Sequence, residues 1–285
     1  MNQMKKIFAI CLGLFLFYSC DTIDKPYFID EGETSVQVEF PALDPNSVYR
    51  KILFEEYTGH RCTNCPAGHA RLASLLETYG DTLVPIGIHA GSLAATNAEY
   101  PYDFTTQIGN QLFTDFNIPS VPIALVNRIL NSNFNTFYSP YSHWQNHINM
   151  VNRNEIFAGI QIINEFDETS RTLTANAKVT ILKDIPDQVQ LCIVIIEDDI
   201  IKPQLNNGVR IPEYVHKHVL RGSLNGNYGS RITFDGLVQK DHSYAKAYKI
   251  NFNDKDWDEN NCYVVAYLIN MESKEILQAE HLKVK

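Results

Sequence analysis

The sequence contains little methionine and no excess of positive charge. Four Met stand against 15 Tyr and 15 Phe, a balance that favours β-rich packing over a helical bundle. Lys and Arg number 24 against 33 Asp and Glu, giving a net charge of −9, whereas nucleic-acid-binding proteins usually carry a basic face. Six cysteines are too few for a disulfide-built miniprotein. We therefore expect no nucleic-acid partner, and the 285 residues suffice for about two domains with cores of their own.

Long apolar runs are absent beyond residue 18. The run at residues 7–18 follows two lysines and precedes Ser19 and Cys20, which is the pattern of a secretory signal. It is shorter than the roughly 20 residues that a transmembrane helix needs. Phe17-Tyr18-Ser19-Cys20 resembles a bacterial lipobox, with Phe17 where Leu is usual. We expect residues 1–19 to be a cleaved lipoprotein signal peptide and Cys20 to carry the lipid that holds the protein at the membrane.

The rest of the chain divides into parts with different hydrophobic patterns. Residues 20–48 are polar, and an apolar alternation at 35–40 predicts a tether with one edge strand. Residues 49–153 are predicted to form an α/β domain, because strand patterns (51–57, 83–89 and 121–126) alternate with helical ones (66–79, 104–116 and 141–151). Residues 154–285 hold several strand patterns separated by turn signals, which predicts an antiparallel sandwich, with a long loop over 198–229.

One short window carries the candidate chemistry. Cys62-Thr63-Asn64-Cys65 follows a predicted strand and opens a predicted helix. Free backbone N–H groups and the helix dipole at that position favour a thiolate at Cys62. The spacing lets Cys65 close a disulfide with it, and Pro66 suits the first helical turn, where its missing N–H costs nothing. Cys62 is the candidate nucleophile and Cys65 the candidate resolving cysteine.

A strand, C-x-x-C, a helix and a later Val-Pro before a strand together resemble the thioredoxin superfamily. The resemblance implies that Pro122 follows a cis peptide bond and faces the cysteines. It also implies a proton-transfer role for Glu56, which stands at the position of that superfamily's buried acid. Arg61 replaces the tryptophan that usually precedes the first cysteine, so substrate contacts and redox potential need not match.

A longer phrase, EEYTGHRCTNCPAGH at residues 55–69, is more specific. With the lipobox, the β-rich second half and YVHKHVLR at residues 214–221, it resembles the Omp28-related lipoproteins of Bacteroidetes. This resemblance implies a lipoprotein of the cell envelope, associated with the outer membrane and facing either the periplasm or the cell surface. It implies an α/β thioredoxin-like domain followed by an all-β immunoglobulin-like sandwich domain. A surface receptor or adhesin role has been suggested for this family.

Two functions from different classes follow. The first is a thiol–disulfide oxidoreductase in which Cys62 attacks, Cys65 resolves, Glu56 assists proton transfer and Pro122 shapes the binding groove. The second is a receptor- or adhesin-type lipoprotein that uses the same fold as a scaffold, with Cys62 and Cys65 as a passive disulfide. Envelope or surface proteins are the expected partners, as disulfide substrates or as ligands, and no cofactor is expected.

Other polar residues have simpler explanations that compete with functional ones. His60, Cys62, Cys65 and His69 lie within ten residues and could hold zinc or Cu(I), but such sites normally use well-separated ligand pairs, so no metal is expected. Glu55 and Glu56 alternate, so one of them is expected to face solvent. His216 and His218 share one strand face, and a solvated face explains them best.

Cys192 and Cys262 each begin an apolar alternation on a predicted strand. They either form a disulfide or stay reduced as small core residues, and we favour the bond.

Overall fold

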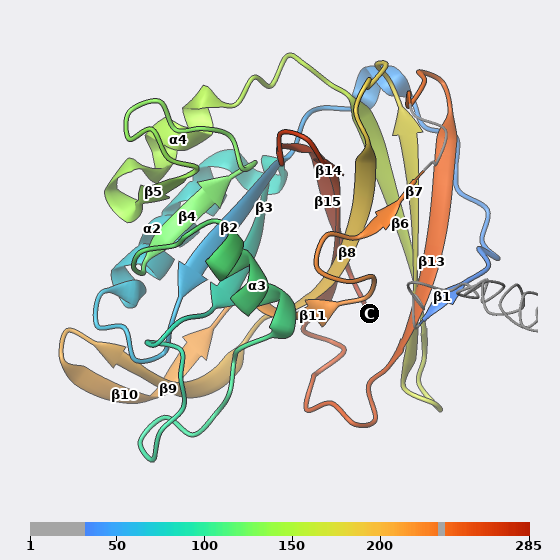
Figure 1. Cartoon of the computed structure of the whole chain (residues 1–285). Helices are drawn as coiled ribbons and strands as arrows, with labels where there is room; N and C mark the ends of the chain where they lie inside the picture. The colour runs from blue at the N-terminus through green and yellow to red at the C-terminus, as the bar shows by residue number, and fades with distance from the viewer. Residues whose placement is uncertain (1–31, 233–236) are drawn as a thin grey trace, which may run out of the picture. The chain divides into compact units, whose positions relative to one another are not determined.

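The structure is a computed structural model that describes residues 32–232 and 237–285 (Figure 1). The predicted signal peptide, residues 1–19, and the predicted lipid-bearing Cys20 lie outside the described residues. The α-helices in the described part are α2 (Cys65–Tyr79), α3 (Gln107–Asp115) and α4 (Trp144–Met150). None of the helices there is long and apolar enough to cross a membrane.

Strands make up most of the regular structure. They are β1 (Glu33–Thr34), β2 (Ile52–Thr58), β3 (Leu83–His89), β4 (Ile123–Val126), β5 (Tyr138–Pro140), β6 (Ala158–Asp167), β7 (Thr172–Ile181), β8 (Val189–Glu197), β9 (Ile200–Asn206), β10 (Val209–His216), β11 (Val219–Ser223), β12 (Ser230–Arg231), β13 (Ser243–Asn251), β14 (Cys262–Asn270) and β15 (Ile276–Lys283).

The largest sheet has nine strands in the order β15-β14-β8-β11-β3-β2-β4-β5, with β12 also paired to β8. β2 and β3 run parallel and are joined through α2, and β11 joins β3 in parallel through a single register pair, Val219 with Gly87. The other pairs are antiparallel. This sheet therefore combines strands from both halves of the chain.

One face of the nine-stranded sheet packs on α3. That core includes Leu53 and Ile88 from the first half and Val194 and Tyr267 from the second, so the two halves share it. On the opposite face, α2 and α4 cover the end that contains β2 and β4. A four-stranded sheet, β1-β13-β7-β6, packs on the same face at β8 and β14, on the other side of Figure 1.

The predicted fold class, an α/β thioredoxin-like domain followed by an all-β immunoglobulin-like sandwich domain, is wrong. The described protein is mainly β, and its helices of 15, 9 and 7 residues do not build a separate α/β layer structure. The strands expected to form two independent cores pair into one mixed sheet because β11 bridges β8 and β3. The domain boundaries at residues 48 and 153 stay predictions.

Residues 198–229, predicted as a long loop, contain β9, β10 and β11. β9 and β10 form a two-stranded hairpin that pairs with no other strand among the described residues. Asn207 and Gly208 make its turn with positive φ angles of 48° and 80°, the backbone that a tight two-residue hairpin requires. We call residues 200–216 the β9–β10 hairpin. The edge strand predicted at 35–40 is displaced to β1, a two-residue strand at the edge of the four-stranded sheet.

Candidate functional site

The C-x-x-C segment lies where β2 gives way to α2. The Cys62 N–H donates to the Gly59 carbonyl oxygen (3.0 Å), closing a turn before the helix, and Pro66 occupies the first helical turn. Cys62 and Cys65 form a disulfide with a Cα–Cα distance of 5.4 Å. Cys62 is 2% exposed and Cys65 0%. The predicted pair is therefore joined, but both sulfur-bearing side chains are buried.

Pro122 and Glu56 lie beside this disulfide. The Val121–Pro122 peptide is cis, and the Cys62 Sγ lies 3.6 Å from the Val121 carbonyl oxygen. Gly68 on α2 allows the close approach, since a Cβ there would be 2.9 Å from both Pro122 Cβ and Glu56 Oε1. The structure thus brings all four predicted site residues together. The chemical roles assigned to them stay predictions.

Glu56 is a buried carboxyl without an ion pair to a permanent cation in the described chain. It is 2% exposed, and its Oε1 has no hydrogen-bond partner. Burial raises the pKa of Glu56 to about 8, so its carboxyl is mostly protonated near pH 7. His69 Nε2 lies 3.8 Å from Glu56 Oε1, and burial lowers the pKa of His69 to about 4. Both groups are thus mostly neutral near pH 7, and Glu56 can donate a proton.

Glu55, the neighbour of Glu56 on β2, is also buried, so the expectation that one of the two faces solvent is wrong. Glu55 is 1% exposed and accepts two hydrogen bonds from Arg128, at 2.8 and 2.7 Å. The two acids point to opposite faces of the sheet, as alternation requires, but each face is covered.

The β9–β10 hairpin covers the C-x-x-C turn. Backbone N–H groups of Leu205 and Asn207 donate to the carbonyl oxygens of His60 (2.8 Å) and Thr63 (3.1 Å). The fully buried Gln204 donates from Nε2 to the Cys62 carbonyl oxygen (3.0 Å). These bonds hold the hairpin against the backbone of the turn that carries Cys62.

A cluster of histidines and aromatic residues lies next to the site. His89 stacks on Phe104 with ring centroids 4.4 Å apart, and His60 stacks on Tyr100 at 5.5 Å. His216 belongs to this cluster and is 2% exposed, so the solvated face predicted for it is wrong. Burial lowers the pKa of His89 well below its usual value and that of His216 to about 3, so both rings are neutral.

The metal set considered from the sequence is not assembled. The thiols are joined, and both His69 nitrogens have partners, Thr58 Oγ1 at 2.9 Å and the Tyr214 hydroxyl at 2.7 Å. His218 lies 3.1 Å from Asp198 in an ion pair available when the imidazole is protonated.

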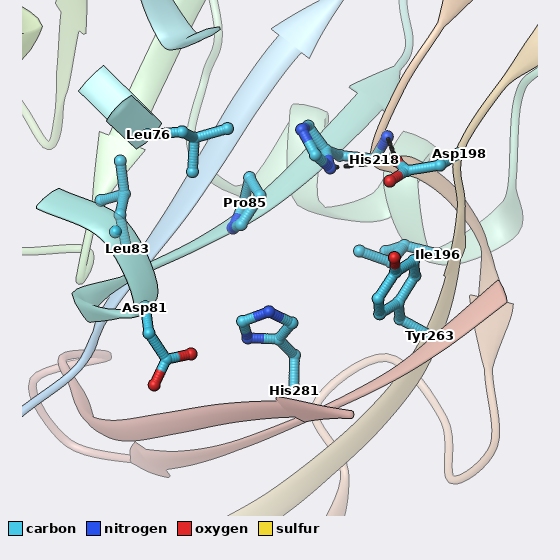
Figure 2. A pocket seen from close by; sticks show the side chains of 10 residues that line it. Leu76, Asp81, Leu83, Pro85, Ile196, Asp198, His218, Tyr263 and His281 are labelled. Atoms are coloured by element: carbon cyan, nitrogen blue, oxygen red, sulfur yellow. Dashed lines mark hydrogen bonds and ion pairs between the residues drawn. The ribbon is translucent and has the colours of Figure 1, made fainter. Parts of the chain in front are cut away.

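A cavity of about 350 Å³ lies between the end of α2, β3 and β14–β15 (Figure 2). At its edge, Asp81, Glu280 and His281 are the one group of three metal-type ligands within reach of a shared ion in the described residues. The Lys51 ammonium already lies 2.6 Å from Asp81 and 2.5 Å from Glu280, so a cation is in place between the two acids. This group therefore needs no metal to balance its charge.

Cys192 and Cys262 are free, and the favoured disulfide between them is wrong. β8 and β14 are neighbours, but Cys192 lies opposite Tyr267 and Cys262 opposite Glu197, which puts the thiols several residues apart. They also face different cores on opposite sides of the sheet. Burial raises the pKa of Cys192 to about 12, so this thiol is not a nucleophile near pH 7.

Three residues at the site were missed from the sequence: His89, Gln204 and Tyr214. Gln204 and Tyr214 come from the segment predicted as loop, about 140 and 150 residues after the cysteines. A signal existed for His89, because it is the polar end of a buried strand next to the C-x-x-C strand.

A family model described as outer membrane protein Omp28 matches residues 109–285, more than half of the chain. The chain belongs to the Omp28 family. The Omp28 assignment places it in the cell envelope, associated with the outer membrane, as the sequence resemblance implied. The matched region contains Pro122 but neither Glu56 nor the two cysteines, so membership by itself assigns them no activity.

Solved structures with a similar fold share little sequence with this Omp28-family chain. HBP35 of Porphyromonas gingivalis aligns with a TM-score of 0.64 and 16% identity, covering 84% of this chain and 76% of that one. Protein AGR_C_4864 from Agrobacterium tumefaciens aligns with a TM-score of 0.51 and 10% identity, covering 84% and 96%. At these identities the likeness shows the fold alone. No curated protein matches the chain significantly.

Proposed function

We propose that this Omp28-family protein is a thiol–disulfide oxidoreductase of the cell envelope that works at the Cys62–Cys65 disulfide. The observation that carries the proposal is the placement of this disulfide at the start of α2, beside Pro122 and the buried Glu56, whose Oε1 has no hydrogen-bond partner and whose pKa is raised to about 8. A disulfide that only stabilises the fold needs no buried acid beside it. A buried carboxyl oxygen without a hydrogen-bond partner lowers the stability of the folded protein.

The proposed oxidation of a client dithiol balances as follows. A client thiolate attacks Cys62 Sγ, breaks the Cys62–Cys65 bond and forms a mixed disulfide, while Cys65 leaves as a thiolate. Glu56, which lies against α2 one turn beyond Cys65, gives that thiolate a proton. The second client thiolate then attacks the client sulfur of the mixed disulfide and releases Cys62, so the client is oxidised by two electrons and the protein reduced by two. A disulfide of another envelope protein would reoxidise the pair by the reverse exchange.

The test is to trap the mixed disulfide. In Cys65→Ser, Cys62 still attacks client disulfides and nothing resolves the product, so covalent adducts with envelope proteins should accumulate. Cys62→Ser should accumulate none, and Cys192→Ser serves as a matched control because its thiol is buried and free. Equal, small losses of stability in both site variants, with no adduct from either, would make the disulfide a passive staple.

The burial of the disulfide favours a second candidate, a binding lipoprotein that holds its ligand through loops and the hairpin. Cys62 and Cys65 are both under 3% exposed, whereas Ile201 and Val215, paired across the β9–β10 hairpin, are 58% and 44% exposed. An apolar outer face of this kind suits a protein ligand better than water. Under this function, pull-down from envelope extracts would give non-covalent partners that depend on Ile201 and Val215 and do not depend on Cys62.

We further infer that Cys20 is lipidated and anchors the protein in the outer membrane, where envelope or surface proteins are its partners. The support is the lipobox-like sequence before Cys20 together with the family assignment. The intact mass of membrane-extracted protein should show acyl chains on Cys20, and Cys20→Ser should move the protein to the soluble fraction. Unchanged membrane partition of that variant would exclude the anchor.

A further inference from the structure

A cavity of about 430 Å³ lies between α2, the end of β3 and the end of the β9–β10 hairpin. Its lining includes four histidines and the acid that the site already uses: His69, His89, His216, His218 and Glu56. Leu76 and Glu77 of α2 and Val215 and Lys217 also line it. The cavity therefore connects the end of the β9–β10 hairpin with the floor of the sheet.

Two of these histidines have unused ring nitrogens. His89 is 3% exposed, and neither its Nδ1 nor its Nε2 has a hydrogen-bond partner. His216 is 2% exposed and faces the backbone of Lys202 and Pro203 without a hydrogen bond of good geometry. A buried polar group left without a hydrogen-bond partner destabilises a fold, so a ligand on these nitrogens would be favourable. The nitrogens of His69, by contrast, are both engaged.

The spacing of the two free rings fits a shared metal ion. Two imidazoles bound to one tetrahedral ion at the usual metal–nitrogen distance of about 2 Å have ring centroids about 5 Å apart. The centroids of His89 and His216 are 5.5 Å apart, with an angle of 61° between the ring planes. Glu56, whose Oε1 has no hydrogen-bond partner, lines the same cavity, and its carboxyl would accept a hydrogen bond from a water molecule on the ion.

We propose that His89 and His216 bind a divalent transition-metal ion such as zinc in this cavity, with water completing the coordination. His89 and His216 are the only protein ligands proposed for this ion. Imidazole is a ligand that such ions favour. His89 ends β3 and His216 ends β10, so the ion ties the β9–β10 hairpin to the central sheet. Metal binding would therefore also hold the β9–β10 hairpin against the C-x-x-C turn.

The first test is metal binding by the full mature chain with the Cys62–Cys65 disulfide intact, so that these two sulfurs are not ligands. Calorimetry with zinc should give one site, and its affinity should fall at least tenfold in His89→Ala and in His216→Ala. His242→Ala is the matched control, because His242 is exposed and far along the chain, and it should bind as the wild type does. Equal binding in all three variants would overturn the proposal.

A second measurement uses the wild type alone, since either core variant could fold poorly. Cobalt(II) added to the wild-type protein should give the visible absorption of a bound, tetrahedral ion with nitrogen ligands. Zinc should also slow hydrogen exchange at the Leu205 and Asn207 amides, which bond the hairpin to the C-x-x-C turn. Absent cobalt absorption with unchanged exchange would mean that water alone fills the cavity. These readouts do not depend on the redox proposal and can fail separately from it.

Discussion

The β9–β10 hairpin should control how fast the Cys62–Cys65 disulfide reacts. Cys62 is 2% exposed, and the hairpin is hydrogen-bonded to the turn that carries it, so we expect a reductant to reach the sulfur faster when the hairpin lifts. Gln204 is the attachment easiest to remove, because its Nε2 donates to the Cys62 carbonyl oxygen at 3.0 Å and to that of Gly59 at 3.3 Å. Gln204→Ala deletes both bonds and leaves the backbone bonds of the hairpin in place.

The size of the effect follows from those two bonds. Each contributes about 0.5–1.5 kcal/mol net, so the closed hairpin should lose about 1–3 kcal/mol relative to the open one. A factor of ten corresponds to about 1.4 kcal/mol, so the open population should rise about 5- to 150-fold. The rate of disulfide reduction by dithiothreitol, followed by alkylation of the new thiols and mass spectrometry, should rise by the same factor when opening is fast.

Gln278→Ala is the matched control for that experiment. Gln278 is also buried, at 3% exposure, and donates to the carbonyl oxygens of Tyr49 and Ala158, away from the hairpin. Its Oε1 also accepts from the Lys51 N–H (2.8 Å), so the variant should destabilise the protein at least as much as Gln204→Ala without exposing Cys62. The reasoning fails if Gln204→Ala is reduced at the wild-type rate, or if both variants accelerate equally through global unfolding.

Two further predictions concern the acids of β2. Because burial raises the pKa of Glu56 to about 8, the native state keeps a proton that the unfolded state releases above its ordinary pKa of 4.5. The free energy of unfolding should therefore fall as pH rises between these values, by about 3 kcal/mol at pH 7. Measured by urea unfolding, Glu56→Gln should lack this decline. If wild type and Glu56→Gln give parallel curves of unfolding free energy against pH, the reasoning about Glu56 is refuted. Arg128→Met should cost about 3–5 kcal/mol in the same assay, because Glu55 is left buried without its partner. Glu55→Gln added to Arg128→Met should recover much of that loss, and no recovery would mean that packing of Arg128 matters more than its charge.

Local elements were predictable where hydrophobic spacing and chain breakers agree. The strand at residues 83–89 has the predicted bounds, and the helix predicted at 66–79 begins one residue earlier. The cis Val121–Pro122 bond and its closeness to Cys62 also agree with the expectation. These features depend on residues near one another in sequence or on a motif that already carries its geometry.

The fold class was not predictable in the same way, because it depends on which strands pair. β11 is short, and its single register pair with β3 joins Val219 to Gly87, 132 positions away. Nothing in the sequence of β11 or of β3 identifies the other as its pairing partner. The hydrophobic pattern of each strand is equally compatible with a separate sheet. Separate sheets were the simpler expectation, and the mixed sheet corrects it.

The sequence of the β9–β10 hairpin contains a local turn signal, but prolines in the two strands argue against a hairpin. Asn207-Gly208 between two strand-length segments is a strong hairpin pattern. Pro203 and Pro212 lie within those segments and suggest a loop, because proline cannot donate to a strand ladder. The hairpin tolerates both prolines, since in the described part of the chain it pairs with no other strand. Its register also shifts between Ile211 and Tyr214, around Pro212.

Glu55 and Glu56 show most directly what a sequence pattern leaves undecided. Alternation correctly puts the two side chains on opposite faces of β2, but it cannot say whether either face is open to water. Arg128, 73 residues later, neutralises Glu55, whereas no arginine or lysine in the described chain is paired with Glu56. The difference between a structural ion pair and a candidate proton donor therefore arises from tertiary partners. For that reason the Glu56→Gln and Arg128→Met measurements should diverge with pH, although the two acids are adjacent in the chain.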